Sequence, residues 1–383
     1  MEKKIINYAK QTIDRSDIKI VKTALNSELL TQGPYSENFE KNINKFFGSR
    51  YSAVMSNGTA GLFLAGKALG WKKNDVIITS PITFIASANA IINNGAAVDF
   101  VDIDKDTYNI DINKLEDKLK KNKKIKSIIA VDYAGHPCDW KSLKYLSNKY
   151  KVTLINDNCH AIGAKYMNDF QYAVKFADIV VHSYHPTKNI TTGEGGSVLS
   201  NNKIIINKIK ILRNHSMIKP HFKIKKYPWY YEIHEAGFNF RLTEFQCALG
   251  ISQLKKIRTF IERRRDIAKK YHKTLKNLEN IILPKEINNS THAYHLFPLQ
   301  INFEEIKLNK SDFFFQMLKQ GIKLQVHYIP IHLQPFYKNM YKKKLRFPIA
   351  EEFYKKEISL PIYPNLTKNE FNKVIYHLLK LIN

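Results

Sequence analysis

The chain of 383 residues is 44% hydrophobic and 12% aromatic, which is typical of a protein that is folded throughout. Its formal net charge of +27 comes from dispersed lysines without an RNP, zinc-finger or helix-turn-helix signature, so we expect no nucleic acid and no membrane among its partners. No apolar run approaches the roughly 20 residues of a membrane span, and the three cysteines lack metal-ligand spacing, which predicts a cytoplasmic protein with no metal site.

Strand-like and helix-like segments alternate between residues 36 and 215. This alternation predicts an α/β fold class with a mostly parallel sheet covered by helices. The segment that begins at Asp111 has the apolar spacing of an amphipathic helix. The strand-like runs are residues 53–55, 76–78, 98–101, 128–131, 152–155 and 179–181.

The sequence changes character near residue 241, where a helical stretch without internal proline runs from Arg241 to about Leu275. After this stretch, the residue pattern predicts, in chain order, a strand over 294–297, a helix over 311–321, a strand over 323–328 and a last helix. We therefore expect a large α/β domain over residues 1–250. A long connecting helix and a small C-terminal α+β domain should follow over residues 251–383.

Three strand ends carry distinctive residues, and in open α/β sheets ligands bind beyond the carboxyl ends of the strands. Residues 56–61 form a small-residue turn into a helix, whose free amides suit a phosphate. Asp157 and His160 follow the strand that ends at residue 155. Lys188 lies after the strand over 179–181, in a segment that ends with Gly193, Gly195 and Gly196.

Each of these features is a weak signal alone, because a strand-end Asp is commonly a helix cap and a Gly-rich turn is often only a turn. Their ordered combination is more specific. An anion site, a carboxylate and a lysine amine are the groups that a pyridoxal-phosphate enzyme needs for the cofactor's phosphate, ring nitrogen and aldehyde.

The sequence resembles the DegT/DnrJ/EryC1/StrS family of sugar aminotransferases over essentially its whole length. The resemblance implies the aspartate aminotransferase-like fold, which is fold type I of the pyridoxal-phosphate enzymes. The matching blocks are residues 8–14, 30–34, 80–84, 133–139, 183–196, 212–215, 237–244 and 326–330.

The resemblance implies a role for each residue that matches a family position. Lys188 matches the catalytic lysine that forms a Schiff base with pyridoxal 5'-phosphate, and Asp157 the carboxylate that keeps the pyridine nitrogen protonated. Phe84 and His160 match the residues on the two ring faces. From the residues alone, ordinary core packing of Phe84 and a capped, hydrogen-bonded core imidazole for His160 remain open alternatives. The phosphate contacts match Gly58, Thr59 and Ser183.

A second group of matches concerns the partner subunit and the substrate. Asn239 and Arg241 resemble a segment that the family contributes to the neighbouring subunit's site, which implies a homodimer with shared active sites. His327 and Tyr328, together with Tyr8, lie where the family approaches the sugar nucleotide. Residues 219–232 match no family feature.

Within the family, residues 183–196 most resemble the pseudaminic acid branch. That resemblance implies a UDP-linked 4-keto-6-deoxy-N-acetyl sugar as acceptor and L-glutamate as donor, with pyridoxamine phosphate carrying the amino group between the two half-reactions. Three alternatives remain: another acceptor such as GDP-4-keto-6-deoxymannose, a dehydratase of the same fold, which would lack the lysine, and a non-catalytic basic binding protein.

Overall fold

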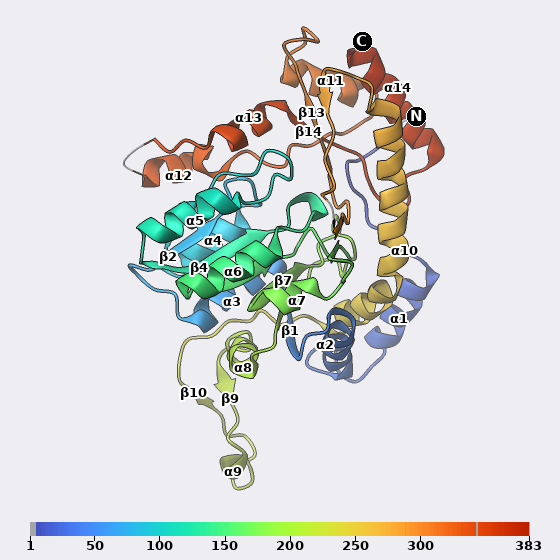
Figure 1. The fold of residues 1–383 in the computed structure, drawn as a ribbon. Helices are drawn as coiled ribbons and strands as arrows, with labels where there is room; N and C mark the ends of the chain where they lie inside the picture. The colour runs from blue at the N-terminus through green and yellow to red at the C-terminus, as the bar shows by residue number, and fades with distance from the viewer. Residues whose placement is uncertain (1–4, 288, 342–343, 383) are drawn as a thin grey trace.

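A seven-stranded mixed sheet is the centre of the protein in a computed structural model, which describes residues 5–287, 289–341 and 344–382 (Figure 1). The strand order is β1-β8-β7-β5-β4-β2-β3, and β8 is antiparallel to both of its neighbours while the other pairs are parallel. The mostly parallel α/β fold and the six expected strands are thus confirmed. The strands are β1 (Tyr51–Met55), β2 (Val76–Thr79), β3 (Ala97–Phe100), β4 (Ile125–Val131), β5 (Thr153–Asp157), β7 (Ile179–Ser183) and β8 (Gly196–Ser200).

Helices cover both faces of this sheet because successive strand residues alternate between two hydrophobic cores. Ala53 and Met55 of β1 belong to one core, whereas Val54 belongs to the other. The first face is covered by α3 (Gly58–Leu69), α4 (Ala86–Asn93) and α8 (Lys203–Leu212). The second face is covered by α2 (Pro34–Phe47), α5 (Ile112–Lys121), α6 (Trp140–Tyr150) and α7 (Tyr172–Phe176).

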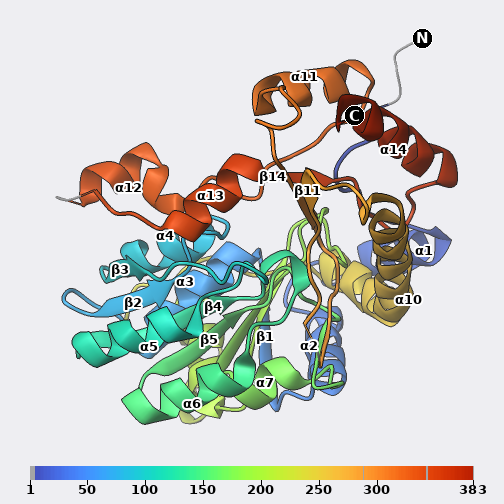
Figure 2. The same ribbon diagram turned by 45° about the horizontal axis from the view of Figure 1, so that its top comes forward.

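The long helix α10 (Glu244–Leu275) connects two parts of the molecule (Figure 2). Its first half packs against α1 (Arg15–Leu25) and α2, and its second half enters a third core with β11 (Ile281–Ile282), β13 (Phe297–Ile301) and β14 (Glu357–Leu360). The helices α11 (Lys310–Lys319) and α14 (Lys368–Ile382) complete this C-terminal part. The division into domains at residue 250 stays a prediction. Among the described residues, no helix combines the length and apolar character that a membrane crossing requires.

Three expectations for the C-terminal half were wrong in detail. The strand expected at 294–297 begins only at Phe297, because the carbonyls of Tyr294 and His295 accept hydrogen bonds from the Arg264 guanidinium at 3.1 and 3.2 Å. The helix expected from residue 311 starts at 310, with Asn309 as its N-cap. The long helix starts at Glu244 and not at 241, after an N-cap and capping box at Thr243.

The strand expected over 323–328 does not form. Gln325 makes one isolated bridge to Ser359, but the next residues use their backbone groups differently. The amide of His327 donates to the Glu357 carboxylate at 3.0 Å, and its carbonyl accepts from the Tyr133 hydroxyl. A segment whose backbone groups bond to side chains cannot continue a strand ladder.

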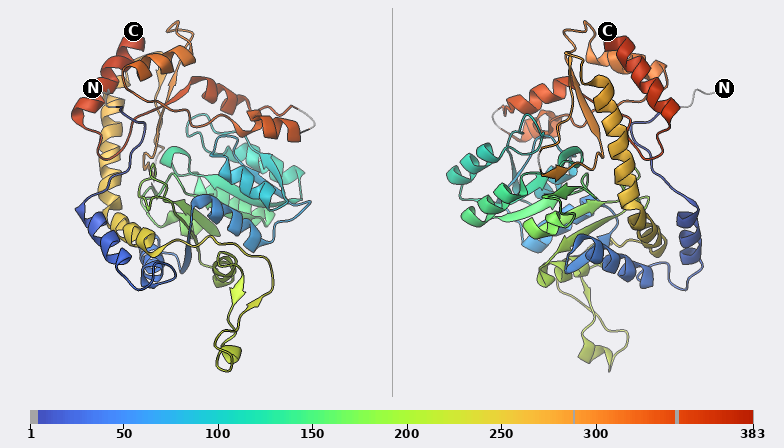
Figure 3. Two further views of the ribbon diagram at one scale, coloured as in Figure 1. Left: turned by 180° about the vertical axis from the view of Figure 1, so that it is seen from behind. Right: turned by 45° about the vertical axis from the view of Figure 1, so that its right-hand side comes forward.

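Residues 217–233, which include the whole of the unmatched 219–232 stretch, form an arm that projects from the sheet domain (Figure 3). The strands β9 (Met217–Ile218) and β10 (Glu232–Ile233) pair at its base, and the short helix α9 (His221–Ile224) lies near its tip. Trp229 and Phe222 are 75% and 72% exposed there. A second small pairing joins β6 (Lys165–Tyr166) to β12 (Ser290–Thr291).

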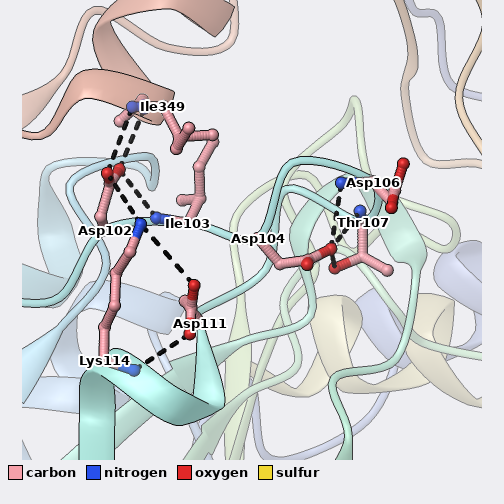
Figure 4. Close-up of polar contacts among 9 residues, drawn as sticks. Asp102, Ile103, Asp104, Asp106, Thr107, Asp111, Lys114 and Ile349 are labelled. Carbon is pink, nitrogen blue, oxygen red and sulfur yellow. Dashed lines mark hydrogen bonds and ion pairs between the residues drawn. The ribbon is translucent and has the colours of Figure 1, made fainter. Parts of the chain in front are cut away.

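A carboxylate of the large sheet domain anchors the C-terminal segment that contains α12 (Pro335–Met340) and α13 (Pro348–Lys356). Pro348 is the first residue of α13 and has no N–H group, so the first amides of this helix belong to Ile349 and Ala350. Asp102 accepts from both, at 3.2 and 3.0 Å, and forms an ion pair with Lys114 (Figure 4). The N-cap residue Phe347 makes no side-chain cap, and the Asp102 carboxylate caps the N-terminus of this helix from a distant part of the sequence.

Candidate active site

A cavity of about 740 Å³ lies beyond the carboxyl ends of β1, β5 and β7, where the C-terminal segment 325–334 forms its other wall. This is the position that the strand ends predicted. The structure brings ten of the twelve predicted site residues together around it: Tyr8, Gly58, Thr59, Phe84, Asp157, His160, Ser183, Lys188, His327 and Tyr328.

The N-terminus of α3 offers backbone amides to an anion. The side chain of the N-cap Asn57 accepts from the Ala60 amide at 2.8 Å, whereas the amides of Gly58 and Thr59 have no acceptor among the described residues. A Cβ on Gly58 would lie 3.0 Å from the Ser183 Cβ, and one on Gly196 would lie 2.5 Å from the Asn57 backbone. The two glycines thus allow the strand ends and the helix to approach closely enough for a phosphate site.

Lys188 lies in the turn after β7, where its amide donates to the His185 carbonyl at 2.9 Å. No hydrogen bond or ion pair of its amine is present among the described residues. Burial lowers the pKa of Lys188, and the neighbouring Cys159 and Asp157 partly oppose this shift. A partly buried amine with a lowered pKa is suited to nucleophilic and proton-transfer chemistry.

Asp157 is the last residue of β5, and its carboxylate is held by hydrogen bonds on both oxygens. Oδ2 accepts from the Ser87 hydroxyl at 2.7 Å, and Oδ1 accepts from the Cys159 amide at 3.3 Å. The Ser87 hydroxyl lies 3.0 Å from that of Thr83. Such contacts fix the direction of a carboxylate that faces the cavity.

His160 is a neutral imidazole whose proton position follows from its two partners. The Ala134 amide donates to Nδ1 at 3.3 Å, so the ring proton is on Nε2, which lies 3.0 Å from the Tyr328 hydroxyl. Burial, with Lys188 and His327 nearby, lowers the pKa of His160 well below its usual value. The imidazole is therefore hydrogen-bonded as a core histidine would be, and it also lines the cavity.

Phe84 is 53% exposed at the cavity wall, and its ring centroid lies 6.0 Å from that of Tyr328. Ordinary core packing is thus excluded for this ring. Within the described part of the chain, this aromatic face lies in one cavity with an unpaired amine, free helix amides and a fixed carboxylate. Together these groups fit a planar, phosphate-bearing cofactor with an aldehyde and a basic ring nitrogen. These side chains fit pyridoxal 5'-phosphate.

Asn239 and Arg241 do not reach the main cavity. Arg241 lines a second cavity of about 250 Å³ and donates to the Asn214 side chain at 2.6 Å, and Asn239 pairs with the Asn214 backbone. Nε of Arg241 is buried and has no hydrogen-bond partner in the described part of the chain. Their expected contribution to a neighbouring subunit stays a prediction.

Several residues that line the cavity, or that lie directly behind its lining, were missed by the sequence analysis. Ser87 could have been recognised from the sequence, because it follows Thr83 by one helical turn just after the strand-end block 80–84. Glu194 and His295 also line the cavity, but they come from a loop and from a segment mistaken for a strand. Glu357, fully buried behind His327, is a lone acid in an apolar strand, which is a weak signal for function.

Comparisons with known proteins agree with this geometry. The profile of the DegT/DnrJ/EryC1/StrS aminotransferase family matches residues 11–379. The chain is 38% identical over 361 residues to a UDP-4-amino-4,6-dideoxy-N-acetyl-beta-L-altrosamine transaminase of Campylobacter jejuni, covering 91% of this chain and 93% of that protein.

Two solved structures are similar over almost the whole chain. Helicobacter pylori PseC, described as an aminotransferase involved in pseudaminic acid biosynthesis, superimposes with a TM-score of 0.91 at 32% identity and 99% coverage of both chains. The PLP-form of Spr1654 from Streptococcus pneumoniae has a TM-score of 0.90 at 26% identity, covering 99% of this chain and 98% of that one.

Proposed function

Because this chain belongs to the DegT/DnrJ/EryC1/StrS aminotransferase family and is an aminotransferase, we propose that it uses pyridoxal 5'-phosphate to aminate a nucleotide-linked keto-sugar. The acceptor is a UDP-linked 4-keto-6-deoxy-N-acetylhexosamine, aminated at C4, and the donor is L-glutamate. One observation carries this proposal. One cavity with the volume of a small-molecule site is lined by Lys188, by Asp157 with its fixed carboxylate and by the start of α3. The Lys188 amine and the first amides of α3 have no partner among the residues that the structure describes.

The proposed roles follow from the chemistry of each side chain. Bound pyridoxal phosphate supplies an electron sink for the carbon from which a proton is removed. The Gly58 and Thr59 amides with the Ser183 hydroxyl hold its phosphate, and Asp157 holds a proton on its ring nitrogen. Lys188 would hold its aldehyde, and its amine would move the proton at the reacting carbon of the substrate. The lowered pKa of Lys188 supports this role, because a protonated amine could do neither.

The UDP-sugar assignment is supported by the names of the Campylobacter and Helicobacter relatives and by the segment from Ser183 to Gly196. A site that hydrogen-bonds a nucleotide and an N-acetyl group rejects analogues that lack those groups. With glutamate as donor, kcat/KM for the UDP keto-sugar should exceed that for GDP-4-keto-6-deoxymannose at least about a hundredfold. The opposite preference would leave the aminotransferase in place and refute the acceptor.

A homodimer with shared active sites is the second part of the proposal. It is supported by Arg241 and Asn239, which match the family's cross-subunit segment yet lie outside the main cavity of their own chain. Mixing inactive Lys188→Ala and inactive Arg241→Ala subunits tests it, since hybrid dimers contain one site free of both changes. Some activity should return on mixing. Failure at every mixing ratio, with subunit exchange confirmed, would refute the shared site.

A further inference from the structure

A buried carboxylate and a buried hydroxyl lie in series behind His327. The Ser359 hydroxyl donates to Glu357 Oε1 at 2.6 Å, and the same hydroxyl oxygen lies 2.8 Å from His327 Nδ1. Glu357 and Ser359 are fully buried on β14, and His327 is 5% exposed on the cavity wall. We name these three residues the Glu357 relay.

The direction of each hydrogen bond in the relay follows from the backbone. The amide of His327 can only donate, and it donates to Glu357 Oε2 at 3.0 Å. When Glu357 is ionised, its other oxygen accepts from the Ser359 hydroxyl, whose single proton is then used. The Ser359 oxygen must therefore accept from His327, which places the imidazole proton on Nδ1.

The charge environment is consistent with these directions. Burial raises the pKa of Glu357 to about 7, although the Ser359 hydroxyl, the Lys310 ammonium and the His327 amide favour the ionised form. The carboxylate is therefore ionised, and these directions hold, above about pH 7. Burial lowers the pKa of His327 to about 3, and the nearby Lys188 contributes to that shift. His327 is thus a neutral imidazole, and its Nε2 presents a lone pair rather than a proton.

The cavity wall consequently has one hydrogen-bond acceptor and one hydrogen-bond donor side by side. The His327 ring lies 5.1 Å from the Tyr8 ring and 5.0 Å from the Tyr328 ring, measured between centroids. The Tyr328 hydroxyl accepts from His160 Nε2, as derived above, and keeps its own proton for a ligand. His327 Nε2 can accept a hydrogen bond, and the Tyr328 hydroxyl can donate one.

We propose that Glu357, acting through Ser359, is a positioning residue that holds His327 in its Nδ1–H tautomer. His327 Nε2 then accepts a hydrogen bond from a hydroxyl or amide N–H of the sugar-nucleotide acceptor. The tautomer follows from the relay alone, whereas the identity of the ligand rests on the proposed function. A polarised imidazole of this kind favours an acceptor that has a donor group at that position over one that lacks it.

The substitution Glu357→Gln tests the relay because it conserves shape while reversing the two side-chain hydrogen bonds that Ser359 makes with Glu357 and His327. The Gln carbonyl must face the His327 amide, so its NH₂ group donates to Ser359. The Ser359 hydroxyl then donates to Nδ1, and the ring proton moves to Nε2. In ¹⁵N-histidine-labelled holoenzyme, the long-range ¹H–¹⁵N correlations of His327 should show the Nδ1–H tautomer for wild type and the Nε2–H tautomer for the variant. A His327→Gln spectrum assigns the signals.

Kinetics of the separate half-reactions provide the second readout. In Glu357→Gln, the KM for the UDP keto-sugar should rise about tenfold or more, because two donors would face each other. The half-reaction with glutamate, followed by cofactor absorbance, should keep its rate. The matched control is Glu351→Gln, which changes a carboxylate that accepts from His332 at 3.0 Å outside this cavity and should alter neither quantity.

A second variant covers the case in which Glu357→Gln fails to fold. Ser359→Ala interrupts the relay and should give a mixture of both His327 tautomers with a smaller rise in KM. The matched control is Ser147→Ala, which removes a comparable buried hydroxyl that donates to the Val152 carbonyl at 2.7 Å. This control should change neither the tautomer nor KM. An Nε2–H tautomer in wild type, or an unchanged tautomer in both relay variants, would overturn the relay. If the tautomers are as expected but the protein does not aminate the UDP keto-sugar, the relay is retained. The ligand assignment and the proposed function are then refuted.

Discussion

One wall of the cavity consists of the carboxyl ends of neighbouring strands, whereas the opposite wall is the non-strand segment 325–334. Asp157 is the last residue of β5 and Lys188 lies in the turn after the neighbouring strand β7, so the sheet positions both. His327 and Tyr328 are held instead by side chains from distant segments, Glu357, Ser359, Tyr133 and His160.

The two walls therefore suit two different functions within one site. The strand-end wall holds the groups suited to the cofactor, and a rigid scaffold suits chemistry that is common to a whole family. The C-terminal wall holds groups that suit acceptor recognition, and its contacts are individual side-chain hydrogen bonds. Changes in the first wall should therefore affect both half-reactions, and changes in the second wall chiefly the sugar half-reaction.

The largest expected effect is that of Lys188→Ala on the strand-end wall. Removal of the group that moves the proton should lower turnover by about three to four orders of magnitude with either substrate. Lys165→Ala is a suitable control, because that lysine lies outside the cavity and near Phe170. A loss confined to the sugar half-reaction would contradict the division between the two walls.

Asp157→Asn should have the second largest effect. An amide cannot hold the proton of a ring nitrogen, so both half-reactions should slow by roughly a hundredfold or more, as when one charge-stabilising group is removed. The free energy of unfolding should change little, since the Ser87 hydroxyl can still donate to the amide oxygen. Activity close to wild type, measured in single-turnover absorbance experiments, would mean that another carboxylate has this role.

Asp102→Ala should mainly affect the anchoring of the C-terminal segment. Two amides at the start of α13 lose their acceptor, which should lower the free energy of unfolding by about 1–2 kcal/mol in urea titrations. Asp106→Ala, which removes an exposed pair with Lys285, should cost much less. Equal losses in the two variants would show that Asp102 does not cap α13 in solution.

The smallest expected effect concerns pH. Burial lowers the pKa of Lys188, so between that lowered value and the ordinary lysine pKa of about 10.4 the unfolded chain binds more protons than the folded one. The contribution of Lys188 to the free energy of unfolding must then rise with pH across this interval. In urea titrations of the cofactor-free proteins, Lys188→Met should have a larger free energy of unfolding than wild type at neutral pH. This difference in free energy should become smaller as pH approaches about 10.4. A difference that does not change with pH would contradict the lowered pKa of Lys188.

The strand-end wall could be predicted from the sequence because apolar runs mark buried strands and the next residues must lie at one edge of the sheet. Lys188, Asp157 and Gly58 were placed correctly around one cavity on that basis. The C-terminal wall could not be predicted in the same way. The β-rich residues 323–328 have the composition of a strand, and only long-range contacts such as that of the His327 amide with Glu357 prevent one. Local propensity contains no information about such partners.

The proposed chemistry depends most on Lys188 of the strand-end wall as the residue that binds the cofactor. Borohydride reduction of the purified holoenzyme fixes the cofactor to the amine that holds it, and peptide mapping then locates the label. We predict a single pyridoxyl label on the peptide that contains Lys188, with none on the other lysines. A label on a different lysine, or a protein that binds no cofactor, would contradict the account.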